Sequence, residues 1–207
     1  MNNNNDDQVI IDKGKNVINI EMEALDKVKG NVDSSFVKAV KMILKCRGKV
    51  ILTGTGKSGL IARKIAATLS CCDIPSFFLN AYECENGDLG VVRKHDVIVA
   101  ISNSGETGVL TKLVIPSCKQ LGCEVIALTG NLESTLADQS NVSIDIKVDR
   151  EAGYLGINAS SSTTATLAMG DALALVAMEL KGTTREKTLF LHQGGAWGEA
   201  LKKEFQK

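Results

Sequence analysis

Five short apolar segments that alternate with helical patterns constrain the fold of this chain more than any other feature. Each is six or seven residues long, and they lie at 49–54, 75–80, 96–102, 124–130 and 142–148. The third and fourth are nearly continuous hydrophobic runs, as expected of strands buried on both faces of a parallel sheet. Helical patterns follow at 60–71, 106–122, 133–140 and 163–182. This alternation predicts an α/β fold, a doubly wound three-layer αβα sandwich around a five-stranded parallel sheet.

Two helical patterns precede the first strand, and a polar stretch precedes both. The first helix is indicated by an apolar stripe of Ile18, Met22 and Leu25. The second has the stripe Phe36, Val40, Ile43 and Leu44, after a cap at Asp33 or Ser34, and ends at Arg47 and Gly48. Residues 1–14 begin with MNNNNDDQ and are expected to be a disordered tail, which leaves 15–207 as a single domain. A tail from about Phe190 ends the chain.

Composition excludes several classes of protein. The chain has 207 residues, and its 24 basic residues balance its 24 acidic ones, which argues against a nucleic acid or an anionic membrane as partner. No apolar run approaches the roughly 20 residues of a membrane span. Two histidines are too few for a histidine-rich metal site, and six cysteines without a CxxC pair or a signal peptide indicate reduced thiols in a cytoplasmic protein.

Polar residues gather where the predicted strands end, which is the edge at which doubly wound sheets bind ligands. After the first strand, Gly54, Gly56 and Gly59 match the dinucleotide pattern GxGxxG. That site also needs an acid at the end of the second strand, where Asn80 stands. A Walker loop would need a glycine where Ile51 stands. Tight-turn glycines explain the pattern but not Lys57, a cation placed where a ligand would lie.

The segment SNSGET at 102–107 is the strongest local signal. Its hydroxyls surround a glycine at a predicted helix start, where backbone N–H groups and the helix dipole attract anions. A second hydroxyl cluster, 160–164, precedes the long apolar helix, and two hydroxyl-rich helix starts suit the monophosphate of a sugar.

Three residues are acid–base candidates: Glu106, Glu151 and His192. Each also has a structural explanation. Glu106 could interact with the helix dipole, Glu151 could be an exposed loop charge, and His192 could be a structural histidine. His95 is interpreted as solvated.

Taken together, these segments resemble the sugar isomerase (SIS) domain family over roughly 15–205. More narrowly they are similar to the arabinose-5-phosphate isomerases of the Kdo pathway. The segments that carry the resemblance, in the family's order, are GTGKSG, PSFFLNAYE, GDLG, AISNSGET, KVDREAGYLG, SSTTATLAMGDALA and a late H-x-GGAxG. The resemblance implies the flavodoxin-like SIS fold and the interconversion of D-arabinose 5-phosphate and D-ribulose 5-phosphate, for Kdo, lipopolysaccharide or capsule precursors.

The same resemblance implies which residues act. The implied catalytic residues are Lys57, Glu106, Glu151 and His192. The implied substrate- and phosphate-binding residues are Gly56, Ser58, Ser102, Asn103, Ser104, Thr107, Ser161, Ser162 and Thr163. A cis-enediolate intermediate needs a base, either Glu106 or Glu151 with a pKa tuned towards 6–7, while His192 could open the sugar ring or shuttle the proton. No cofactor and no essential metal are expected.

Three departures from the family pattern stand out. Asn86 replaces a family histidine, Gln193 replaces the proline of His-Pro-Gly-Gly, and the CBS domains that follow in many relatives are absent, so an SIS-only form is expected. Relatives complete their active sites across subunits, which implies a homodimer or homotetramer, with the helix 163–181 as interface or as core. A sugar nucleotide could act as a feedback ligand. Two alternatives stay open: another SIS isomerase, for a heptose, hexulose or amino-sugar phosphate, and a non-catalytic phosphosugar sensor.

Overall fold

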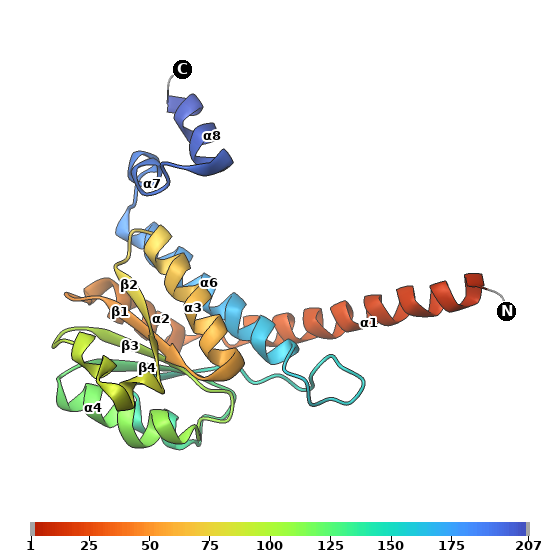
Figure 1. Ribbon diagram of the computed structural model, residues 1–207, viewed down its shortest axis with the longest axis horizontal. Helices are drawn as coiled ribbons and strands as arrows, with labels where there is room; N and C mark the ends of the chain where they lie inside the picture. Colours follow the sequence, from red (N-terminus) through yellow and green to blue (C-terminus); the bar gives the residue numbers. More distant parts are fainter. Residues whose placement is uncertain (1–2, 206–207) are drawn as a thin grey trace.

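Five parallel strands form one sheet at the centre of the chain (Figure 1), in a computed structural model that describes residues 3–205. The strands are β1 (Val50–Gly54), β2 (Ser76–Asn80), β3 (Val97–Ile101), β4 (Glu124–Thr129) and β5 (Val142–Asp145), in the order β2-β1-β3-β4-β5. This confirms the predicted α/β architecture. Strand order reverses between β1 and β3, so the switch point at which such folds bind ligands lies at their carboxyl ends.

Helices cover both faces of the sheet, because the central strands are apolar on both sides. Every residue of β1 and β3 is buried, and alternate residues enter two different hydrophobic cores. One face carries α2 (Ser34–Lys45), α3 (Gly56–Cys71) and α6 (Ser161–Lys181). The other carries η1 (Glu83–Asn86), η2 (Asp88–Val91), η3 (Leu110–Val114), α4 (Ile115–Gln120) and α5 (Thr135–Gln139). The resulting three layers are the predicted sandwich.

The second helix has the predicted cap and most of the predicted buried stripe. Asp33 is the N-cap of α2, and its Oδ1 accepts a hydrogen bond of 2.7 Å from the backbone N–H of Ser35. Phe36, Val40 and Ile43 are buried, whereas Leu44, expected in the same stripe, is 38% exposed. The cap and the stripe together fix where α2 begins and which face it turns to the sheet.

The first helix differs from its prediction in length and in orientation. Helix α1 (Asn3–Gly30) includes most of the stretch expected to be disordered. It packs on α6 through Ile20, Ala24 and Val28, whereas Ile18 and Met22, expected to be buried, are 62% and 60% exposed. The packed half nucleates the helix, and extending a nucleated helix by further residues costs little. The helix therefore continues beyond the body of the protein (Figure 1).

The helix predicted at 106–122 starts later and is irregular. Helical structure begins at Gly108 and passes through the π-helical turn η3 before α4. Pro116 lies in the first turn of α4 and has no N–H to donate to the preceding turn. The irregular turn leaves 102–107 as a loop in front of the helix. The last strand is also shorter than predicted, since β5 ends at Asp145.

By length and composition, α6 is a helix that could cross a membrane, although the sequence analysis expected no such run. It packs against α1, α2 and α3, and its buried side includes Ala165, Met169, Leu173 and Ala177. At Gly170 an added Cβ would overlap Cδ1 of Ile65 in α3. This close contact with other helices is that of a core helix in a globular domain.

Asp96, at the edge of the sheet away from the polar loops, provides a test of stability. Its side chain is nearly fully buried, and its carboxylate accepts hydrogen bonds from Lys49 N and Lys49 Nζ, both 2.9 Å, and from Arg93 N, 2.8 Å. Burial alone would raise the pKa of Asp96, but these donors outweigh it and lower the pKa. The carboxylate therefore stabilises the fold above the carboxyl's unfolded pKa, and this contribution is lost as pH falls through the lowered folded pKa.

Asp96→Asn is expected to lower the free energy of unfolding by about 2–3 kcal/mol at pH 7, because an amide nitrogen then faces donors. Urea unfolding of both proteins measures this difference. The difference should shrink as pH falls, because the wild-type carboxyl itself becomes protonated. A difference that stays constant down to the acid unfolding transition would contradict this interpretation.

Candidate active site

The polar loops after β1, β3 and β4 lie side by side at the switch point. Gly54 pairs with Ile101 in the sheet register, and a Cβ on Gly54 would lie 3.0 Å from the Ile101 carbonyl oxygen. The next loop is joined by a hydrogen bond of 3.0 Å from Gly130 N to Asn103 O. The sheet therefore brings GTGKSG (54–59), SNSGET (102–107) and, at the end of β4, TGN (129–131) to one edge, as expected for polar segments that follow parallel strands.

Helix α3 begins at Gly56, four residues before its predicted start, so Lys57 and Ser58 lie in its first turn. Its N-cap, Thr55, makes no side-chain capping bond. The first N–H groups of a helix have no acceptor within the helix, and the helix dipole is positive there. Lys57 is exposed and adds a full charge at the same place. This turn can hold an anion.

The SNSGET turn is built from its own hydroxyls. Ser102 is buried, and its Oγ lies 2.8 Å from Thr107 Oγ1 and accepts a 3.1 Å bond from Gly105 N. Ser104 Oγ accepts a bond of 3.2 Å from Glu106 N. Gly105 has φ of +71°, and a Cβ there would overlap the Ser134 hydroxyl. Because Ser102 and Thr107 share one hydrogen bond, one of their two hydroxyl protons is left for a ligand.

Glu106 uses both carboxylate oxygens within the protein. Oε1 accepts from Thr135 N and Oε2 from Thr135 Oγ1, each at 2.8 Å. These bonds lower the pKa of Glu106, so this exposed carboxyl is ionised at neutral pH. It fixes the loop after β3 to the start of α5. Thr135 is a partner that sequence reasoning missed, because 29 residues separate the two.

Glu151 accepts hydrogen bonds through one of its two carboxylate oxygens, from residues at the start of α6. Its Oε2 accepts hydrogen bonds from Ser160 N at 2.8 Å, Ser162 N at 3.1 Å and Ser160 Oγ at 3.2 Å. Burial alone would raise the pKa of Glu151, but these serine donors together lower it. The structure therefore lowers the pKa of both glutamates, which contradicts the prediction of a base whose pKa is tuned towards 6–7.

The hydroxyl cluster at the start of α6 is largely occupied by neighbouring groups of the protein. Besides the Ser162 N–H that binds Glu151, Thr163 Oγ1 donates to Ser160 O at 2.8 Å. Ser161 is fully buried, and its hydroxyl has no hydrogen-bond partner among the described residues. The Ser162 hydroxyl also acts on Glu151, so of the three residues expected to bind substrate here Ser161 alone keeps an unused hydroxyl.

Helices α3 and α6 run side by side in the same direction, which brings Lys57 and Glu151 to one end. Lys64 pairs with Asp171 at 2.6 Å, and further along Asp73 pairs with Lys181 at 2.8 Å. The first turns of both helices therefore lie at the end where the strands terminate (Figure 1).

His192 does not join these residues within one chain. It is the C-cap of α7 (Arg185–Leu191), and its Nδ1 lies 2.8 Å from Thr188 O. Helices α7 and α8 (Gly195–Phe205) lie beyond the far end of α6 (Figure 1), whose 21 residues span about 31 Å. Glu151 and His192 thus flank opposite ends of α6.

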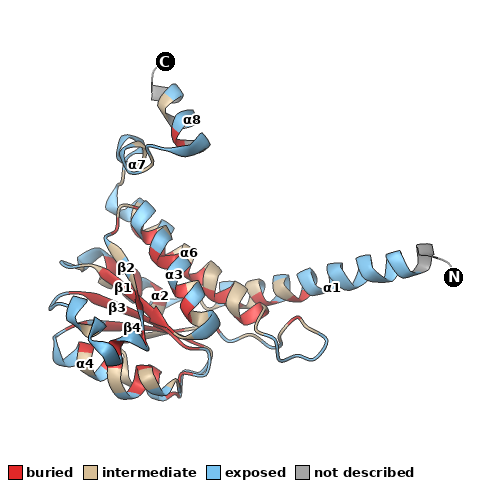
Figure 2. Cartoon of the chain, viewed as in Figure 1, coloured by how far each residue is buried: buried red, intermediate tan, exposed pale blue. Residues whose placement is uncertain are grey.

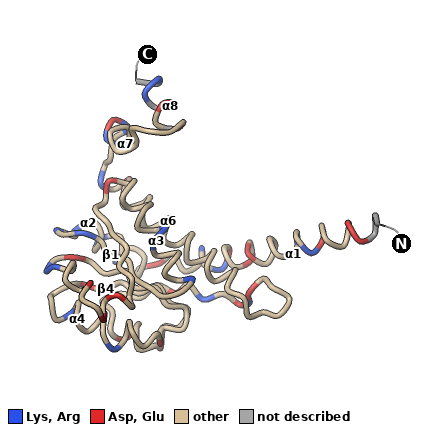
Figure 3. The backbone as a smooth tube through the Cα atoms, viewed as in Figure 1, with Lys and Arg blue, Asp and Glu red and all other residues tan. Residues whose placement is uncertain are grey.

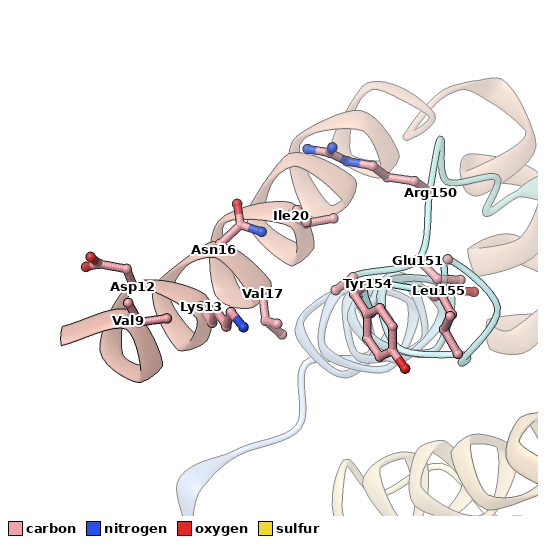
Figure 4. Close-up of a pocket in the computed structure, with 13 residues that line it drawn as sticks. Val9, Asp12, Lys13, Asn16, Val17, Ile20, Arg150, Glu151, Tyr154 and Leu155 are labelled. Carbon is pink, nitrogen blue, oxygen red and sulfur yellow. The ribbon is translucent and has the colours of Figure 1, made fainter. Parts of the chain in front are cut away.

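A cavity of about 980 Å³ borders Glu151 and was missed by sequence reasoning. Its walls are α1 and the loop 150–156 (Figure 4), with Asn16, Lys13 and Tyr154 among the lining residues. The sequence contains one signal of this cavity, the aromatic Tyr154 placed between two glycines. In the structure its side chain is 97% exposed.

Asn86, which replaces a family histidine, is exposed in η1. Among the described residues, no three His, Cys, Asp or Glu side chains are grouped to hold a metal.

This fold, with a cationic helix start and a hydroxyl-rich turn at its switch point, is that of a sugar isomerase domain. The SIS domain family matches residues 42–176, and the chain belongs to that family.

Particular relatives are more informative about the branch of the family. The chain is 42% identical over 191 residues to arabinose 5-phosphate isomerase KdsD of Pseudomonas aeruginosa, covering 92% of this chain and 58% of that protein. KdsD of Escherichia coli K12 is 45% identical over 188 residues, covering 91% and 57%. The chain thus spans little more than half the length of these curated relatives.

The chain can be superposed on almost the whole length of one solved structure. That structure is of a protein of an Escherichia coli strain in complex with arabinose 5-phosphate, which is 41% identical with a TM-score of 0.83, covering 91% of this chain and 97% of that one. A putative sugar-phosphate isomerase from Listeria monocytogenes is 31% identical with a TM-score of 0.87, covering 90% and 98%.

Proposed function

We propose that this chain is an aldose–ketose isomerase that interconverts D-arabinose 5-phosphate and D-ribulose 5-phosphate. The observation that carries the proposal is the 41% identity, over 97% of that chain, to a structure in complex with arabinose 5-phosphate. The 42–45% identity to proteins named arabinose 5-phosphate isomerase supports it. In this proposal the protein acts in the cytoplasm and supplies a precursor of Kdo, lipopolysaccharide or capsule.

The substrate phosphate lies against the first turn of α3 in this proposal. The N–H groups of Gly56, Lys57 and Ser58 and the Lys57 ammonium supply positive potential. The turn after β3 adds hydroxyls from Ser102, Ser104 and Thr107, beside Asn103. A role for Ser161 in binding substrate stays a prediction, because its unpaired hydroxyl is fully buried. A monophosphate needs this number of local donors and no broad basic surface, which agrees with the zero net charge.

Glu151 is the base in this proposal. Its Oε2 is anchored by Ser160 and Ser162, which leaves Oε1 to take the proton from C2 of the open-chain aldose and return it to C1. The cis-enediolate formed between these steps carries negative charge that Lys57 stabilises. Glu106 has both oxygens bound by Thr135, so its role is to hold the SNSGET turn in place.

His192 reaches the site from a second copy of the chain in this proposal, as a ring-opening or proton-shuttling group. The length of α6 between Glu151 and His192 supports sharing of the site, in a homodimer or homotetramer. A sugar nucleotide as feedback ligand stays a prediction, as does the effect of Asn86.

An NMR assay with arabinose 5-phosphate tests the proposal directly. Conversion to ribulose 5-phosphate, with uptake of solvent deuterium at the exchanging carbon, is the expected result. Turnover of a hexulose or amino-sugar phosphate instead would favour a sibling isomerase. Binding of sugar phosphates without turnover would favour a sensor.

The pH profile tests the direction in which the pKa of Glu151 is shifted. Because the serine donors lower that pKa, Glu151 is deprotonated and competent as a base above the ordinary glutamate pKa of about 4.3. Activity is therefore lost through this group only as pH falls below that value, and Glu151 should cause no acid limb of kcat/KM near pH 6–7. A coupled assay from pH 3.5 to 9 measures the profile. An acid limb near pH 6–7 whose midpoint moves in Glu151→Asp would assign a raised pKa to Glu151 and contradict the structure.

A further inference from the structure

Asp73 has a backbone conformation that favours glycine. It follows the end of α3 with φ of +61°, and its N–H donates to Ser70 O at 3.2 Å. The N–H of Ile74 donates to Leu69 O at 3.0 Å. A helix that ends in this way usually has glycine at the left-handed position, because other residues are strained there. An aspartate kept at such a position indicates a use for its carboxylate.

The Asp73 carboxylate contacts two ammonium groups on either side of a short link between helices. Lys181 is the last residue of α6, and its Nζ lies 2.8 Å from Asp73 Oδ2. Lys187 lies in α7, with its Nζ 3.6 Å from Asp73 Oδ1. The link is formed by 182–184. One carboxylate therefore connects the end of α3 to the helices before and after the link, where charged residues of both signs adjoin (Figure 3).

Helix α7 has no buried residue that would fix its direction (Figure 2). The link before it contains Gly182, with φ of +73°, and so begins with the least restricted kind of residue. The direction of α7 therefore depends on polar contacts more than on apolar packing. The pair of Asp73 and Lys187 is such a contact, and Lys187 Nζ also lies 5.5 Å from the centre of the Phe190 ring in its own helix.

The direction of α7 determines where His192 lies. His192 is the C-cap of α7, and its Nδ1 lies 2.8 Å from the backbone oxygen of Thr188, so the ring moves with the helix. The 7 residues of α7 span about 10 Å, and a rotation of about 10° at the link would displace the ring by about 2 Å. A misplacement of about 1 Å can lower a catalytic rate roughly 100-fold.

We propose that Asp73 is a positioning residue for His192. Its carboxylate holds Lys181 and Lys187 on either side of the link and thereby sets the direction in which α7 presents the histidine to the active site. This inference rests on the proposed function, in which His192 acts in the site of a second copy. The contact that holds α7 can nevertheless be measured without substrate.

Hydrogen exchange followed by mass spectrometry tests this contact. The amides of α7 are expected to exchange roughly 2- to 5-fold faster in Asp73→Gly and in Lys187→Gln, the size of effect that partly exposed ion pairs give. Lys203→Gln is the matched control, because it removes the same charge from α8, where Lys203 is exposed and has no ion pair among the described residues. Exchange of α7 that is equal in all of these proteins would overturn the proposal.

The variant Asp73→Gly separates positioning from stability. Glycine suits the left-handed backbone at this position, so the unfolding temperature is expected to stay close to that of the wild type. In the NMR assay kcat is expected to fall roughly 10-fold with KM little changed, because the proposed phosphate donors lie at the other end of α3. Adding Lys187→Gln to Asp73→Gly should cause little further loss, since both changes break the same pair.

Hybrid dimers distinguish positioning of His192 from a general structural role. When a Glu151→Gln chain pairs with a His192→Ala chain, the one complete site takes its histidine from the Glu151→Gln chain. Lys187→Gln is expected to lower the activity when that chain carries it, and to have no effect when the His192→Ala chain carries it. Equal losses in both arrangements, or no loss in either, would overturn the proposal.

The assay of the wild type separates failure of this inference from failure of the proposed function. A wild type that turns over substrate while Asp73→Gly keeps its kcat contradicts this inference alone. A wild type without turnover contradicts the proposed function, and hydrogen exchange then still decides whether Asp73 holds α7.

Discussion

Glu151→Gln is expected to lower kcat by roughly 10²- to 10⁴-fold, the usual contribution of a positioned general base. The amide keeps an oxygen that can accept from Ser160 and Ser162, so the start of α6 should keep its structure. KM should change much less than kcat, since the phosphate donors come from other loops. The NMR exchange assay measures the loss, and thermal unfolding verifies the fold.

Glu106→Gln is the matched control, since it changes a carboxylate at the same edge whose two oxygens are bound by Thr135. We expect it to impair substrate binding through a looser SNSGET turn while leaving most of the proton-transfer rate. If Glu106→Gln abolishes turnover and Glu151→Gln retains it, the roles assigned to the two glutamates are reversed.

Mixing two inactive variants should restore activity. If His192 acts on Glu151 of the other subunit, Glu151→Gln and His192→Ala chains that exchange subunits form hybrid dimers in which one of the two sites carries both native residues. With random exchange, half of the dimers are hybrid, so about a quarter of wild-type activity is expected. The coupled assay after mild dissociation and reassociation measures it.

The control for this experiment is the double variant Glu151→Gln with His192→Ala mixed with wild type. In its hybrid dimers, each shared site combines one residue of the wild-type chain with one residue of the double variant. Each of these sites therefore lacks either native Glu151 or native His192, and only the wild-type dimers are active. Activity should therefore fall to about a quarter of the wild-type value when equal amounts exchange at random. A mixture of the two single variants that stays inactive, although hybrid dimers are detected by mass, would place both residues in the same subunit's site or remove His192 from the mechanism.

The sequence predicted only part of the chemistry of the candidate site. Lys57 and the SNSGET turn were found because glycines and hydroxyls after buried strands have few structural explanations. The two glutamates could not be told apart, because what separates them is contact with distant residues: Thr135 lies 29 positions from Glu106 and binds both of its oxygens. Burial predicted a raised pKa for the base, yet the serine donors at the start of α6 reverse the direction.

The sequence also could not predict which face of the first helix packs on the rest of the chain. Its sequence contains two apolar stripes, one through Ile18 and Met22 and one through Ile20, Ala24 and Val28. Helical periodicity identifies both equally well. The choice between them depends on where α6 lies. Residues 3–14, expected to be disordered, are helical because a helix that is already docked can extend at little cost.

The sequence by itself determined the α/β class, the five parallel strands, the edge at which ligands bind and the family. These follow from local periodicity and from residues that the backbone places directly after strands, so neighbours along the chain suffice to specify them. Tertiary structure alone decided which face of α1 is buried, which glutamate keeps a free oxygen, and that Glu151 and His192 lie beyond opposite ends of α6, a helix about 31 Å long. Each of these depends on contacts between segments distant in sequence, whose free energies arise only when the chain has folded.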